Sequence, residues 1–67
     1  MSIKELILET AEELRDSCAD MSVDELYEQA RMEHLWALGS RDNEEATDHE
    51  VRADAFRLLA QEKEEDK

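Results

Sequence analysis

The apolar residues of this chain recur three and four positions apart, the spacing that places side chains on one face of an α-helix. The first such stripe consists of Ile3, Leu6, Ile7, Ala11, Leu14 and Cys18. Ser2, just before this stripe, and Glu5, three residues later, have the spacing of a capping box. In a capping box the two side chains satisfy backbone N–H groups at a helix start. These features predict a first helix over about residues 3–19.

A second helix is predicted over about residues 23–38, because Ser22 and Glu25 repeat the capping box before another apolar stripe. Gly39, the only glycine of the chain, suits a left-handed cap at the end of this helix. The connection to the first helix is short, so we expect the first two helices to form an antiparallel hairpin.

A third helix is predicted over about residues 43–61, with Ser40 or Asp42 as its N-cap. Its apolar residues lie on two lines, so this helix is expected to contact other elements on both sides. The sequence therefore predicts an all-α fold, a small three-helix protein in which helix 3 packs across the hairpin. Residues 1–60 would form a single helical domain, and residues 61–67 a charged, frayed tail.

The net charge of the chain limits which partners it can bind. Twenty acidic residues stand against eight Lys and Arg, which gives a formal net charge of −12. Such a surface repels nucleic acid and anionic lipid, so direct binding to either is disfavoured, whereas a basic protein surface is attracted. At about 100° per residue, one flank of the first helix gathers a band of carboxylates about 100° wide. This acidic band consists of Glu5, Glu9, Glu12, Glu13, Asp16 and Asp20.

Two interpretations of the acidic band remain open. Like-charged pairs four residues apart each cost a helix a few tenths of a kcal/mol, so the band weakens the fold slightly. A partner-directed role would explain its presence, because a row of carboxylates resembles a phosphate backbone. Solubility alone would also explain it, because runs of charge on a helix surface are usually solvated.

Some apolar residues lie off the main stripes. Met32 and Trp36 lie nearly opposite the apolar face of the second helix, where they either anchor a partner or are covered by helix 3. Helix 3 carries more apolar residues than one stripe needs, which leaves both a monomer and a homodimer open. The candidate self-association residues are Val51, Ala55, Phe56, Leu58 and Leu59.

The sequence offers little for catalysis or metal binding. Cys18 is the only cysteine and is expected to be a buried structural thiol, while His34 and His49 lack the spacing of zinc or di-iron ligands. No nucleophile motif or glycine-rich phosphate loop is present. We therefore expect no enzyme activity, no cofactor and no metal. The start of the chain resembles no export signal and no apolar run is long enough for a membrane span, so the cytoplasm of a cell or of an infected host cell is the expected location.

These features favour an acidic inhibitor or adaptor that occupies a basic surface of a partner protein, as a nucleic-acid mimic of viral or mobile-element type would. The acidic band would supply the charge, and Met32 and Trp36 the apolar anchors. One alternative is a structural or assembly subunit that self-associates through helix 3, with acidity serving solubility only. A further alternative is an antitoxin-like partner of a cationic enzyme.

Overall fold

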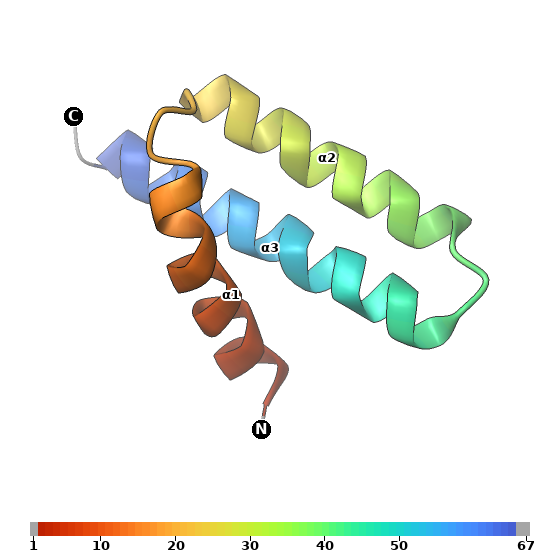
Figure 1. Cartoon of the computed structure of the whole chain (residues 1–67). Coiled ribbons are helices and arrows are strands. Elements are labelled where there is room, and N and C mark those ends of the chain that lie inside the picture. The colour runs from red at the N-terminus through yellow and green to blue at the C-terminus, as the bar shows by residue number, and fades with distance from the viewer. Residues whose placement is uncertain (1, 66–67) are drawn as a thin grey trace.

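A computed structural model describes residues 2–65, which form three α-helices and no strand (Figure 1). The helices are α1 (Ile3–Ser17), α2 (Val23–Gly39) and α3 (Asn43–Glu65). Within this range no helix combines the length and the apolar character needed to cross a lipid bilayer. The predicted all-α, three-helix fold is confirmed.

The helices begin where the capping residues predict. The Ser2 hydroxyl accepts from the backbone N–H of Glu5 at 3.2 Å, and at α2 both hydrogen bonds of the Ser22–Glu25 capping box are present. Before α3, the Asp42 carboxylate accepts from the N–H of Glu44 at 3.0 Å. These bonds satisfy N–H groups that a helix start otherwise leaves without partners.

Gly39 differs from the expectation. It remains helical as the last residue of α2, and no residue in the described range, glycine included, has a positive φ. Extended backbone at Ser40 ends the helix instead, and the Ser40 N–H bonds to the carbonyl of Ala37 at 3.2 Å. The left-handed glycine cap is therefore wrong, because the chain leaves α2 without needing that conformation.

Helix α3 lies between the other two helices and packs against both (Figure 1). Helix α2 runs antiparallel beside it and shares the larger contact, while α1 crosses its other side. The expected hairpin of α1 and α2 is wrong in this respect, because α1 and α2 diverge from their short connection and make no direct helix-to-helix backbone contact. Buried apolar residues lie on two sides of α3, so α3 buries the apolar stripes of both neighbours.

The core contains many alanines, which let the helices approach closely. Ala53, Ala55 and Ala60 of α3 are fully buried, and Leu26 of α2 is the largest side chain that is fully buried. One apolar cluster joins all three helices and includes the connection between α1 and α2. Its buried members are Ala11, Cys18, Leu26, Ala30, Ala55, Phe56, Leu59 and Ala60.

The predicted frayed tail is also corrected, because α3 continues through residues 61–65. The Lys63 ammonium donates to the carbonyl of Ala19 at 3.0 Å and to that of Met21, both in the connection between α1 and α2. The Arg15 guanidinium donates to both carboxylate oxygens of Glu62, at 3.0 and 2.9 Å. Contacts with α1 and its connection thus hold the end of α3, and residues 66 and 67 lie outside the described range.

Candidate functional site

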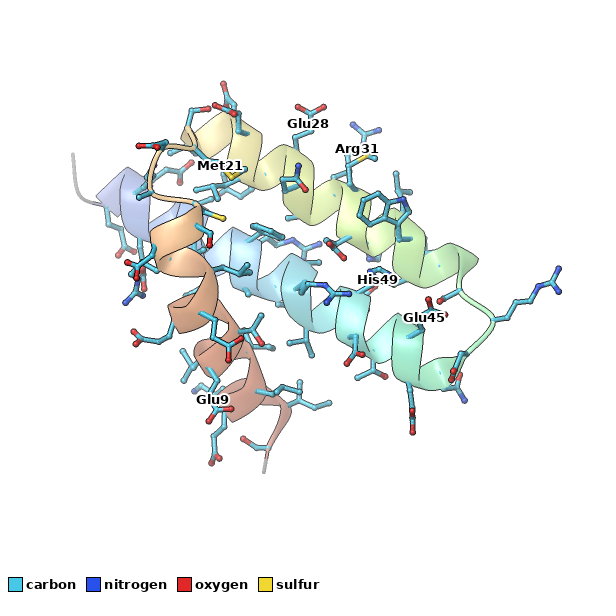
Figure 2. The ribbon with its side chains drawn as sticks, viewed as in Figure 1. Glu9, Met21, Glu28, Arg31, Glu45 and His49 are labelled. Atoms are coloured by element: carbon cyan, nitrogen blue, oxygen red, sulfur yellow. The ribbon has the colours of Figure 1, made fainter. Side chains whose placement is uncertain are left out.

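The acidic band lies on the solvent-facing side of α1. All of its residues are exposed, whereas Ala11, about half a turn around the same helix, is buried against the rest of the fold. Figure 2 shows Glu9 projecting from α1 away from the other two helices. Packing of the apolar stripe onto α3 therefore directs the carboxylates outward, as the helical periodicity predicts.

Few cations offset these carboxylates. The Arg15 guanidinium pairs with Glu12 at 2.7 Å and is shared with Glu62 at 2.9 Å. Within residues 2–65, no other residue of the acidic band has an ion-pair partner. Most of the band therefore presents unbalanced negative charge to solvent.

Asp20 is the exception to the helical row. Helix α1 ends at Ser17, two residues before the predicted end, and the chain turns through residues 18–20. The turn is closed by the Met21 N–H, which donates to the carbonyl of Cys18 at 3.1 Å. Asp20 is exposed in this turn, so it adds charge near the band without continuing its geometry.

Trp36 is not covered by helix 3. Trp36 is 49% exposed, and Met32, one turn earlier, is 40% exposed. One contact orients the indole, whose ring lies 5.8 Å from the His49 imidazole at a tilt of 58°. The reading in which helix 3 buries Trp36 is wrong, and both residues are available at the surface.

The structure separates the acidic band from Met32 and Trp36. The band belongs to α1 and the apolar pair to α2, and these helices lie on the two sides of α3 (Figure 1). In Figure 2, Glu9 on α1 lies far from Glu28 and Arg31 on α2. The residues expected to form one partner-binding site therefore form two surfaces.

The predicted self-association residues of helix 3 are packed inside the fold. Val51, Ala55, Phe56 and Leu59 are buried, and Leu58 is half-buried against the core cluster. They line the sides of α3 that contact the other helices, so the apolar surplus is used within one chain. The prediction that these residues form a self-association surface is therefore wrong.

Two histidine–carboxylate pairs join α2 to α3. Glu33 Oε2 lies 2.6 Å from Nδ1 of His49 and 3.4 Å from Nε of Arg52. One residue further along each helix, His34 Nδ1 lies 2.7 Å from Oε1 of Glu50. Glu33 is only 8% exposed. Among residues 2–65 it is the one charged residue that is buried.

The sequence contained a signal for this polar cluster. Glu33 follows Ala30 by three residues and precedes Ala37 by four, so it shares their buried face. Periodicity within α2 does not show that His49 of α3 lies opposite Glu33, so the contact between the two helices was not predicted from the sequence.

Cys18 is buried, as expected, and burial raises the pKa of its thiol while the Lys63 ammonium lowers it. At the same end of α3, partial desolvation and then the Glu64 carboxylate raise the pKa of the Tyr27 hydroxyl of α2. Among residues 2–65, no group of His, Cys, Asp and Glu side chains is arranged to hold a metal ion. The thiol is buried in the apolar cluster that joins the three helices.

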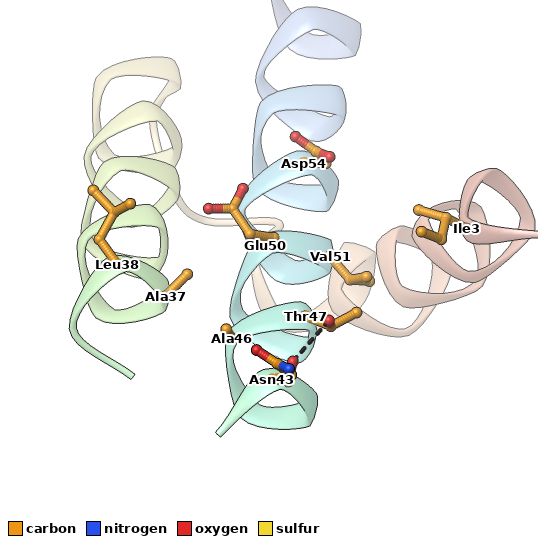
Figure 3. Close-up of a pocket in the computed structure, with 9 residues that line it drawn as sticks. All are labelled: Ile3, Ala37, Leu38, Asn43, Ala46, Thr47, Glu50, Val51 and Asp54. Atoms are coloured by element: carbon orange, nitrogen blue, oxygen red, sulfur yellow. Dashed lines mark hydrogen bonds between the residues drawn. The ribbon is translucent and has the colours of Figure 1, made fainter. Parts of the chain in front are cut away.

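An open hollow of about 390 Å³ lies where α1 and α2 diverge (Figure 3). Its walls include Ile3 of α1 and Leu38 of α2, and the floor is a side of α3 with Glu50 and Asp54. Each of these carboxylates already has a partner, His34 and Arg57 respectively. The hollow contains no arrangement of nucleophile and base.

Comparison of the chain with protein-family models, with curated proteins and with solved structures gave no match.

Proposed function

We propose that this protein binds a basic surface of a partner protein through the acidic band of α1, as an inhibitor or adaptor. The observation that supports this is the unbalanced charge of the band, which is exposed on a capped helix with one ion-paired member, Glu12, among the described residues. A cationic groove that otherwise holds nucleic acid is the preferred kind of partner. A cationic enzyme, as in an antitoxin-like pair, would offer the same chemistry.

The spacing of the carboxylates suits such a groove. Successive residues four apart on a helix advance about 6 Å, and alternate phosphates of one DNA strand advance about 7 Å. Each exposed charge pair contributes about 0.2–1 kcal/mol, so several carboxylates have to act together. The complex should therefore weaken as salt is raised.

The test compares two variants of equal net charge. One neutralises Glu9, Glu13 and Asp16 in the band, and the other neutralises three exposed carboxylates at the start of α3. The control positions are Glu44, Glu45 and Asp48. Each variant raises the formal charge of −12 by three, so both have −9.

Immobilised wild type and both variants are exposed to a lysate of the source cells at low salt, and bound proteins are eluted by a salt gradient and quantified by mass spectrometry. We expect some lysate proteins to bind both wild type and the α3 variant but not the α1 variant. Circular dichroism checks that both variants remain helical. Equal losses from both variants would show that retention follows total charge, and the proposal would be wrong.

A further inference from the structure

One side of α3 is left open by both of the other helices. On that side Asn43, Thr47, Glu50 and Asp54 lie four, three and four positions apart, so they form one line along about 16 Å of the helix. This line is part of the floor of the open hollow of about 390 Å³ (Figure 3). The hollow therefore extends along α3, as a groove that binds a helix does.

Large apolar side chains are exposed on both walls of this hollow. Leu38 of α2 is 71% exposed and Ile3 of α1 is 64% exposed, the two highest values among the large apolar residues of the described part. In Figure 3 they lie on either side of α3. Ala37, Ala46 and Val51 add apolar surface between them. The hollow thus offers apolar contact on both flanks of a polar line.

The polar line is acidic. The side chains of Glu50 and Asp54 are each 43% exposed, and each contacts its partner, His34 or Arg57, through one carboxylate oxygen. Within residues 2–65 the second oxygen of each has no hydrogen-bond partner, and none of the nine residues that line the hollow is Lys or Arg. A neutral imidazole leaves the charge of Glu50 in place, and an exposed pair such as Asp54 with Arg57 is weak. Positive charge is therefore attracted between the apolar walls.

We propose that this hollow binds a basic amphipathic α-helix of a partner protein, which lies along α3 as a fourth helix. Its inner face has Lys or Arg along the middle, opposite Glu50 and Asp54, and apolar residues on both flanks, against Leu38 and Ile3. A small molecule fits this surface less well, because binding pockets enclose most of their ligand and this hollow is open on the side away from α3.

The contact is short and separate from the acidic band. It extends over about three helical turns, which is less than the roughly 1,200–2,000 Å² of stable complexes requires, so we expect a dissociation constant on the order of 100 μM. The acidic band lies on the solvent-facing side of α1, whereas the hollow lies over α3. Either proposal can therefore fail alone.

Two synthetic peptides test the chemistry of the occupant. Both are amphipathic helices with leucines on two flanks of one face, and the middle of that face carries lysine in one peptide and glutamine in the other. Fluorescence anisotropy of each labelled peptide is followed as the protein is added. We expect the lysine peptide to bind at least about fivefold more tightly. Equal affinities, or no binding of the lysine peptide at millimolar protein, overturn the proposal.

Two double variants of equal net charge locate the bound lysine peptide. Glu50→Gln with Asp54→Asn neutralises the hollow, and Glu9→Gln with Glu13→Gln neutralises part of the acidic band. Each raises the formal charge of −12 by two, so both have −10. We expect about fivefold weaker binding for the hollow variant and less than about twofold for the band variant. Equal losses would show that binding follows net charge, and a larger loss from the band variant would place the peptide on α1. Both results overturn the proposal.

A matched pair of leucine variants tests the apolar wall. Leu38→Gln removes apolar surface from the hollow, and Leu35→Gln removes it from the outer face of the same helix, where Leu35 is 49% exposed. We expect Leu38→Gln to weaken binding of the lysine peptide about fivefold and Leu35→Gln to leave it unchanged. If the two variants bind the peptide equally well, the helix does not lie in the hollow.

Discussion

The two histidine–carboxylate pairs between α2 and α3 allow a matched test of what burial contributes to such a contact. Glu33 with His49 and His34 with Glu50 have nearly equal distances of 2.6 and 2.7 Å, and both span the same two helices. They differ in exposure. The Glu33 and His49 side chains are 10% and 18% exposed, whereas those of His34 and Glu50 are both 43% exposed.

The perturbation is a double-mutant cycle with alanine at each pair. Removing one partner of a fully buried ion pair costs about 3–5 kcal/mol. The Glu33–His49 site keeps some contact with water, and Arg52 beside it is 43% exposed, so we expect Glu33→Ala to cost about 2 kcal/mol. The coupling energy of Glu33 with His49 should be about 1–2 kcal/mol, against about 0.2–1 kcal/mol for His34 with Glu50.

The assay is urea unfolding followed by circular dichroism, with all variants of both cycles measured in one buffer. A chain of 67 residues is expected to have about 3–10 kcal/mol of stability, so a loss of about 2 kcal/mol leaves a measurable folded state. Alanine also favours helix over glutamate or histidine by a few tenths of a kcal/mol, and the cycle cancels that contribution. If Glu33→Ala does not fold, Glu33→Gln removes the charge and keeps the side chain's volume.

Equal coupling energies for the two pairs would refute the reasoning, because distance alone would then set the strength. A larger coupling for the exposed pair would refute it more strongly. Burial of Glu33 would in that case have no energetic consequence beyond packing.

Three further predictions concern the core, the end of α3 and the surface charge. Burial raises the pKa of Cys18, so its thiol should react with a disulfide reagent at mildly alkaline pH far more slowly in the folded protein than in urea, and equal rates would contradict its placement. Lys63→Met removes the donor to the carbonyls of Ala19 and Met21 and should lower the free energy of unfolding by about 1 kcal/mol in urea titration, whereas Lys4→Met on the exposed side of α1 should change it little. A loss no larger than that of the control would show that Lys63 does not hold the connection. Moderate salt should raise the Tm measured at low protein concentration, because it screens like charges on a chain of net charge −12, and a fall in Tm would indicate that ion pairs dominate.

The sequence was sufficient for the helices and for the acidic band because both depend on local order along the chain. Ser22 and Glu25 lie three residues apart, and that spacing alone brings their side chains and backbone N–H groups together. The two apolar lines of α3 likewise predicted that it contacts elements on both sides. The direction of the carboxylates followed from the same periodicity once the apolar stripe of α1 was known.

Contacts between helices were harder to predict because they depend on which neighbour each face meets. The short connection suggested that α1 packs on α2, but the apolar residues on both sides of α3 make it the better partner for each. To predict the contact of Glu33 with His49, one has to know that α2 and α3 run side by side. Trp36 was ambiguous for the same reason, since its exposure depends on where α3 crosses.

The central position of α3 has a consequence for biosynthesis. The ribosome makes α1 and α2 first, yet these helices have no shared helix interface on which to settle. Until the third helix leaves the exit tunnel, Leu26 and Ala11 lack the surface that buries them, and the nascent chain presents apolar stripes to chaperones and proteases. Tertiary structure should therefore appear late and in one step, when α3 has been made and packs on both α1 and α2.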